Sequence, residues 1–228
     1  MILRLILPEP DVVAFLDGDV LARPVTRTII IMASQVAGPS VVWSQLAELQ
    51  GNKNSPSNAR TVTFVREILG RTLTPPGVAS ERFTDTSPTD RQILADAEAA
   101  GATILVTSDV DDYAEADLDS VGITAANPDL FLSIILTEDT YLDVLEQIAA
   151  GRRNPPQTAA TLHGQLGRQH PRTVDRFASL FSAEPSAPTH AEPRILSRGH
   201  RCLRCGTFVA AKGTLAFGLC DICAATQP

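Results

Sequence analysis

Short apolar segments alternate with helical segments through the first half of this 228-residue chain. The apolar runs that suit buried strands cover residues 12–16, 41–43, 103–106 and 121–124. Parallel strands need long crossovers, so this alternation predicts an α/β fold with a mainly parallel sheet. Hydrophobic residues make up 44% of the chain and charged residues 20%, which is enough apolar material for a core.

The segments between the predicted strands have the length and composition of helices. Helices are expected at 20–34, with a true start near Pro24, and at 44–50 and 59–69. The sequence Ser87-Pro88-Thr89-Asp90 is typical of a helix start, with Ser as the cap and Pro in the first position. A polar loop is expected at 52–58 and a further short strand at 81–84.

Beyond Asn127 the alternation stops and four helices follow, at 128–136, 139–150, 157–167 and 171–181. We interpret residues 1–135 as the α/β domain and 136–182 as a helical extension. Residues 183–198 are rich in Pro, Ala and Ser and are expected to form a linker, and 199–228 form a cysteine module.

Charge is distributed unevenly along the chain. The formal net charge is −7, yet residues 194–228 carry five basic residues against one acid. An acidic body with a basic tail can still approach phosphate if bound cations neutralise its acids. No segment is long and apolar enough for a membrane span or an export signal, so a cytoplasmic protein with no membrane contact is expected.

Four acids fall at the same end of the predicted sheet, where open α/β folds place their sites. They follow the first strand, lie one turn beyond the second, open the helix at 90 and follow the third strand: Asp17, Glu48, Asp90 and Asp109. Taken singly, each has an ordinary structural role as a cap, a helix-terminal charge or a turn residue. Clustered carboxylates repel one another, so the set indicates a site for Mg²⁺ or Mn²⁺, which prefer oxygen ligands.

Three segments resemble the motifs of PIN-domain nucleases. They are FLDGDVL at 15–21, WSQLAEL at 43–49, and the block from DRQILA at 90–95 to GATILVTSD at 101–109. The resemblance covers roughly residues 10–135. It implies a Rossmann-like three-layer α/β/α sandwich and Mg²⁺- or Mn²⁺-dependent cleavage of RNA, usually endonucleolytic. The metal-binding and catalytic acids that it implies are Asp17, Glu48, Asp90 and Asp109.

The fourth motif departs from the family pattern. The family often continues as Asp-x-Asp-Phe, whereas this chain has one extra residue before Tyr113, so either Asp111 or Asp112 could reach the site. Asp19 lies where the family often has Asn or Ser, and it is either an auxiliary ligand or a turn residue. Three nearby arginines either grip phosphate or lie on solvated helix faces: Arg23, Arg27 and Arg91.

All four cysteines lie in the last 27 residues as two pairs, Cys202 with Cys205 and Cys220 with Cys223. Two C-x2-C pairs at this separation predict a tetrahedral zinc site with four thiolate ligands, of the zinc-ribbon kind. The alternative is two disulfides or free thiols, which a cytosolic setting disfavours. The metal would supply most of the folding energy of so small a segment, and the module would contact RNA or a protein.

The sequence therefore favours a metal-dependent endoribonuclease with RNA as its partner. A non-catalytic PIN-like module that binds nucleic acid or protein is the first alternative. A toxin-type nuclease with an antitoxin partner and a nuclease for DNA flaps are the others. Self-association into a homo-oligomer is a further alternative for its assembly.

Overall fold

The computed structural model describes residues 12–36, 39–54, 61–152 and 155–181, and two short antiparallel strands, β5 (His200–Arg201) and β6 (Phe208–Val209). The chain divides into two compact units. Unit 1 comprises Met1–Val65 and Thr72–Ile135, and unit 2 comprises Arg66–Arg71 and Leu136–Pro228. Within the described ranges, no helix is long and apolar enough to cross a membrane.

Unit 1 contains a four-stranded sheet in the order β2-β1-β3-β4, in which every neighbouring pair is parallel. The strands are β1 (Val13–Leu16), β2 (Ser40–Val42), β3 (Ile104–Val106) and β4 (Thr124–Ala126). Side chains of β1 are buried on both faces, as expected for a parallel sheet covered by helices. The predicted α/β fold with a parallel sheet is therefore confirmed.

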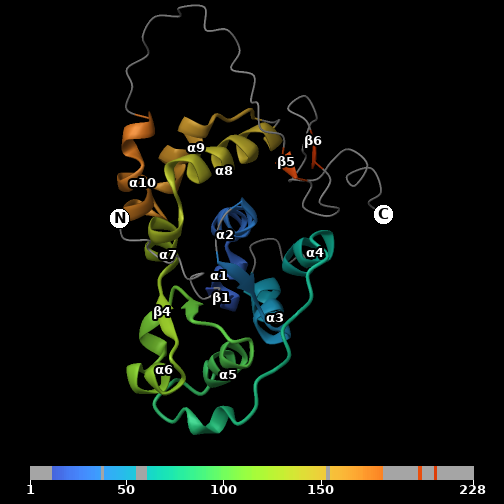
Figure 1. The fold of residues 1–228 in the computed structure, drawn as a ribbon, viewed down its shortest axis with the longest axis vertical. Coiled ribbons are helices and arrows are strands. Elements are labelled where there is room, and N and C mark those ends of the chain that lie inside the picture. Colours follow the sequence, from blue (N-terminus) through green and yellow to red (C-terminus); the bar gives the residue numbers. More distant parts are fainter. Residues whose placement is uncertain are drawn as a thin grey trace, which may run out of the picture. The chain divides into compact units, whose positions relative to one another are not determined.

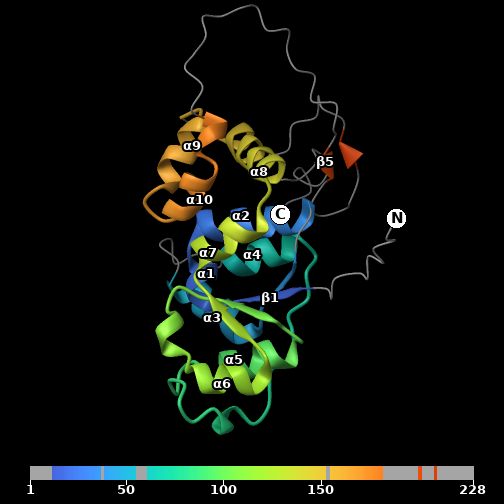
Figure 2. The ribbon, with the colours of Figure 1, turned by 60° about the vertical axis from the view of Figure 1, so that its left-hand side comes forward.

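Helices cover both faces of this sheet. Figures 1 and 2 show α2 (Pro24–Val36) and α7 (Pro128–Ile135) on one side, and α5 (Arg91–Ala99) and α6 (Glu115–Val121) on the other. Across the sheet, the step from β1 to β2 leads toward one edge, and the step from β2 to β3 leads back past β1 toward the other edge. Right-handed crossovers therefore place the connecting helices on opposite faces, and a switch point arises where β1 adjoins β3.

Two glycines allow α1 (Gly18–Ala22) to pack closely against α3 (Gln45–Asn54). A Cβ atom on Gly18 would lie 2.5 Å from Cβ of Gln50, and one on Gly51 would lie 2.8 Å from Cβ of Leu21. Real Cβ atoms do not approach so closely, so larger residues at either position would push the two helices apart. Pro24 then starts α2, as predicted.

Several local predictions differ from the structure. The strand expected at 81–84 is wrong, because Ser80–Arg82 form a 3-10 helix. The strand expected at 121–124 begins only at Thr124, because α6 runs to Val121 and ends at Gly122 with φ +66°. Residues 52–54 of the expected loop continue α3, and the rest of that loop lies outside the described residues. The next helix, α4, spans Thr61–Ile68.

The described residues of unit 2 between 136 and 181 are mainly helical, with α8 (Glu138–Gly151), α9 (Ala159–Leu166), α10 (Pro171–Arg176) and a 3-10 turn at Ala178–Phe181. Its core contains an aromatic cluster. The rings of Tyr141 and Phe177 stack with centroids 4.4 Å apart, and His163 stacks on Phe181 at 4.3 Å. The hydroxyl of Tyr141 also lies 2.9 Å from Nδ1 of His163.

Candidate functional site

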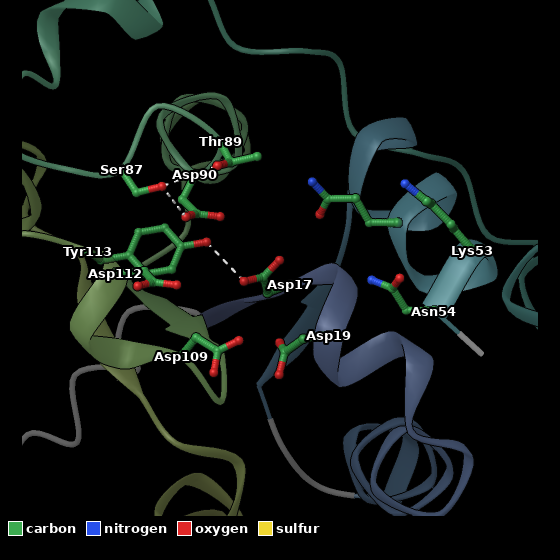
Figure 3. Close-up of a pocket in the computed structure, with 11 residues that line it drawn as sticks. Asp17, Asp19, Lys53, Asn54, Ser87, Thr89, Asp90, Asp109, Asp112 and Tyr113 are labelled. Atoms are coloured by element: carbon green, nitrogen blue, oxygen red, sulfur yellow. Dashed lines mark hydrogen bonds between the residues drawn. The ribbon is translucent and has the colours of Figure 1, made fainter. Parts of the chain in front are cut away.

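A pocket of about 330 Å³ lies in unit 1 beyond the carboxyl ends of β1 and β3 (Figure 3). This is the switch point of the sheet, where open α/β folds bind ligands. Five aspartates contribute to its lining. The lining residues are Asp17, Asp19, Gln50, Lys53, Asn54, Ser87, Thr89, Asp90, Asp109, Asp112 and Tyr113.

The aspartates come from three separate segments of the chain. Asp17 directly follows β1 and is the N-cap of α1, and Asp19 lies in the first turn of that helix. Asp90 precedes α5, while Asp109 and Asp112 lie in the loop between β3 and α6. The two strand ends meet because Leu16 pairs with Val106 in the sheet register, so residues that follow the strands become neighbours. The backbone N–H of Asp17 donates to the carbonyl of Val106 at 3.0 Å.

Asp17 is the most constrained acid of the pocket. It is 7% exposed, and its Oδ2 accepts hydrogen bonds from Thr107 Oγ1 at 3.0 Å and from the Tyr113 hydroxyl at 2.9 Å. Its Oδ1 accepts from the backbone N–H of Gly18 at 2.5 Å. Burial, with a smaller effect from the charge of Asp19, raises the pKa of Asp17 to about 6 despite these hydrogen bonds.

Asp19 has one carboxylate oxygen with a partner and one without. Its Oδ2 accepts from the backbone N–H of Ser108 at 3.1 Å and lies 3.8 Å from the guanidinium of Arg23. Its Oδ1 is buried and accepts no hydrogen bond from the described residues. A buried carboxylate oxygen is costly to leave unsatisfied, so this atom points to a cation or an ordered water.

Asp90 is held by Ser87, whose hydroxyl donates to Oδ2 of Asp90 at 2.7 Å (Figure 3). Ser87 therefore bonds the carboxylate rather than capping α5, which begins at Arg91. Burial raises the pKa of Asp90, the Ser87 bond opposes this, and the nearby charge of Asp112 adds to the rise. The backbone N–H of Ser87 donates to the carbonyl of Asp112 at 3.1 Å, which joins two lining loops.

Glu48 and Asp111 do not belong to the pocket lining. Glu48 is 6% exposed, with Oε1 accepting from Thr63 Oγ1 at 2.8 Å and Oε2 accepting from Trp43 Nε1 at 3.3 Å. These contacts connect α3 to α4 and to the end of β2. The metal-binding role expected of Glu48 stays a prediction. Of Asp111 and Asp112, Asp112 lines the pocket, and its role as an auxiliary ligand also stays a prediction.

The three arginines near the acids differ in their surroundings. Arg23 is exposed beside Asp19. Arg27 is 4% exposed and donates to the carbonyl of Leu21, so it lies neither on a solvated face nor in the pocket lining. Arg91 donates to two backbone carbonyls, those of Thr84 and Thr86, and thereby braces the segment that leads to Asp90.

Six lining residues were not predicted from the sequence: Gln50, Lys53, Asn54, Ser87, Thr89 and Tyr113. Gln50, Lys53 and Asn54 share the i, i+3, i+4 spacing of one helix face, but only after α3 is extended to Asn54. Tyr113 reaches Asp17 across 96 residues, and no local pattern indicates such a pairing.

The carboxylate oxygens that line this pocket are suitable ligands for a cation that prefers oxygen. The unsatisfied Oδ1 of Asp19 supports this fit. Within the described residues, no three His, Cys, Asp or Glu side chains form a group that could hold a metal ion. The acids surround an open space rather than converge on a point. Such an arrangement suits Mg²⁺, which is usually held by one or two carboxylates together with several waters. The four cysteines, Cys202, Cys205, Cys220 and Cys223, lie outside the described residues.

Comparisons with known proteins leave the family of this chain open. No protein-family model, curated protein or solved structure matches it.

Proposed function

We propose that this chain is a PIN-type, divalent-metal-dependent endoribonuclease that hydrolyses RNA phosphodiester bonds in the pocket beyond β1 and β3. The observation that carries the proposal is the set of five aspartates around one pocket at the switch point of a parallel sheet. Helices on both faces of the sheet suit a Rossmann-like three-layer sandwich.

The charge of the pocket supports a cation-dependent activity. Five aspartates against Lys53 leave a formal excess of four negative charges, which would repel a phosphodiester. Two divalent cations would offset this excess. When bound, Mg²⁺ or Mn²⁺ would supply positive charge against the phosphodiester and activate a water for in-line attack.

The chain's own residues have distinct parts in this proposal. Asp17, Asp90, Asp109 and Asp112 would hold the cations. The unsatisfied Oδ1 of Asp19 would bind a cation directly or accept a hydrogen bond from a water of its shell. Asp17 is held in one orientation by Thr107 and Tyr113, so it loses little entropy on binding a cation. The Ser87 hydroxyl does the same for Asp90.

A second metal is proposed for the tail. Cys202, Cys205, Cys220 and Cys223 have the spacing of a structural Zn²⁺ site, and the adjoining arginines would let this module contact RNA or a protein partner.

A second candidate function is a binding module without turnover. The observation in its favour is that no three acids of the described ranges form a metal-binding group. Such a module would bind RNA or a protein, an antitoxin included, through the same pocket face. Cleavage assays separate it from the nuclease, because the module predicts binding without product.

The direct test is cleavage of labelled RNA in the presence of Mn²⁺, with EDTA as the metal-free arm. Asp90→Asn should reduce the rate at least ~100-fold, because it removes a cation-holding carboxylate. Asp119→Asn is the matched control, since Asp119 is exposed on α6 and does not line the pocket. Full activity of a folded Asp90→Asn variant, or activity that survives EDTA, would contradict the proposal.

A further inference from the structure

The wall of the pocket opposite the acids is formed by the last turns of α3. Gln50, Lys53 and Asn54 lie at positions i, i+3 and i+4 of this helix, so their side chains share one face. Figure 3 shows Lys53 and Asn54 on α3, across the pocket from Asp90, Asp109 and Tyr113. One wall therefore carries carboxylates, and the other carries two amides and an ammonium group.

Packing fixes this wall on two sides. On one side the absence of a side chain at Gly18 and Gly51 lets α3 approach α1 closely. On the other side the Asn52 amide accepts a hydrogen bond from the N–H of Val62 at 2.9 Å and donates to Thr63 Oγ1 at 2.7 Å. Because α3 is held between α1 and α4, the face with Lys53 has a defined position relative to Asp17.

Lys53 is the only cationic residue among those that line the pocket in the described ranges. It is exposed, and no ion pair to it occurs within those ranges. A lysine ammonium is a strongly hydrated point charge that binds phosphate oxygens without a fixed geometry. The neighbouring amides of Gln50 and Asn54 can donate to the same oxygens.

We infer that the C-terminal turn of α3 is a phosphate-binding subsite of this pocket, in which Lys53 contacts the phosphate next to the scissile one. This inference rests on the proposed nuclease function. The acids and their cations would hold the scissile phosphate, and Lys53 would hold its neighbour on the same strand. The competing role for Lys53 is purely structural, since a cation near the end of a helix stabilises its dipole.

The salt dependence of RNA binding separates these two roles. A short fluorescein-labelled single-stranded RNA is titrated with the full-length wild-type protein over a series of NaCl concentrations, and anisotropy gives the binding constant. Ca²⁺, which also prefers oxygen ligands, replaces Mn²⁺ so that the acids keep their cations, and a denaturing gel checks that the RNA stays intact. The wild type is the parent, and the substitutions are Lys53→Gln, Lys53→Arg and Arg82→Gln. Arg82 serves as the charge-loss control because it pairs with Glu98 outside the pocket.

Loss of one phosphate contact should reduce the slope of log K against log salt by about 0.7 for a single strand, which is a loss of about fivefold in affinity near ~0.1 M salt. We expect this change for Lys53→Gln, and parental slopes for Lys53→Arg and Arg82→Gln. A helix-stabilising role predicts a lower melting temperature with no change of slope. An unchanged slope in Lys53→Gln, or no measurable binding by the parent, overturns the inference.

Cleavage by the wild-type protein, measured in parallel, distinguishes failure of the subsite from failure of the nuclease. A reduced slope in Lys53→Gln without wild-type cleavage would keep the phosphate subsite and reject hydrolysis. Cleavage together with an unchanged slope would keep the nuclease and reject the subsite. If both hold, Lys53→Gln in the active protein should raise KM more than it lowers kcat.

Discussion

The hydroxyl of Tyr113 donates a 2.9 Å hydrogen bond to Oδ2 of Asp17, although 96 residues separate the two in sequence. Burial and the negative charge of Asp17 raise the pKa of Tyr113 far above its ordinary value, so this hydroxyl stays a donor at all relevant pH values. The bond joins the loop after β3 to the end of β1. It thus connects the two strand ends that carry the acids.

Removing this hydroxyl should weaken cation binding. We expect Tyr113→Phe to reduce Mn²⁺ affinity, measured by calorimetry, about tenfold. Loss of a group that orients a metal ligand typically lowers metal affinity by ~10–100-fold. Tyr141→Phe is the matched control, since it removes a buried hydroxyl bonded to His163 in unit 2. Equal losses of Mn²⁺ affinity in the two variants would argue against an orienting role for Tyr113.

The pKa of Asp17 makes the stability of the cation-free protein depend on pH. Its folded-state pKa of about 6 exceeds the ordinary value of 3.8, so between these values the folded protein binds more protons than the unfolded chain. The contribution of Asp17 to stability therefore falls as pH rises through this window. By pH 7 the cost approaches about 3 kcal/mol, at ~1.4 kcal/mol per pKa unit.

Asp17→Asn should remove this dependence. In EDTA we expect the unfolding free energy of the wild type, measured by urea denaturation, to fall relative to that of the variant as the pH rises from ~4 to ~7. Saturating Mn²⁺ should stabilise the wild type and leave the variant nearly unchanged. A difference between the two proteins that is constant with pH would contradict the raised pKa.

Close packing of α1 and α3 should make Gly51 intolerant of substitution. Gly51→Ala places a methyl group 2.8 Å from Cβ of Leu21, and we expect it to cost about 1–3 kcal/mol of unfolding free energy. Gly164→Ala in α9 is the control, because no atom lies within 4 Å of its new Cβ and alanine favours a helix. Comparable destabilisation by both substitutions would contradict the packing explanation.

Substitution of Glu48 tests whether its carboxylate has a structural role or binds a cation. Glu48→Gln leaves an acceptor for Thr63 but turns a donor toward Trp43 Nε1, so we expect a lower melting temperature. Mn²⁺ affinity should stay within about twofold of the wild type, because Glu48 does not line the pocket. A loss of affinity as large as that of Asp90→Asn would instead identify Glu48 as a cation ligand.

The sheet was predictable because its strands are short, apolar and separated by crossovers. Asp17 and Asp109 could be placed near each other from sequence, since the carboxyl ends of parallel strands meet at one edge. Asp90 was expected at the start of a helix, and it is the N-cap residue of α5 and lines the pocket, although the helix begins at Arg91 and not at Pro88. These predictions needed only local patterns and one rule of topology.

What the sequence could not predict depends on tertiary contacts. Glu48 accepts hydrogen bonds from Thr63 on the next helix and from Trp43, and it does not line the pocket. Helix α6 was not predicted, and its end at Gly122 displaced the expected start of β4. The choice of Asp112 over Asp111 follows from the 3-10 turn at Val110–Asp112, whose geometry a count of residues does not reveal.

The most direct test of the central claim is a crystal structure of the full-length protein soaked in Mn²⁺, with anomalous diffraction to locate the ion. The proposal predicts an anomalous peak in the pocket, coordinated by oxygens of Asp17, Asp90 or Asp109 directly or through water. The peak should vanish in Asp90→Asn crystals soaked in the same way. A Mn²⁺-soaked pocket without an anomalous peak, or a peak that survives Asp90→Asn, would contradict a catalytic metal site formed by these acids.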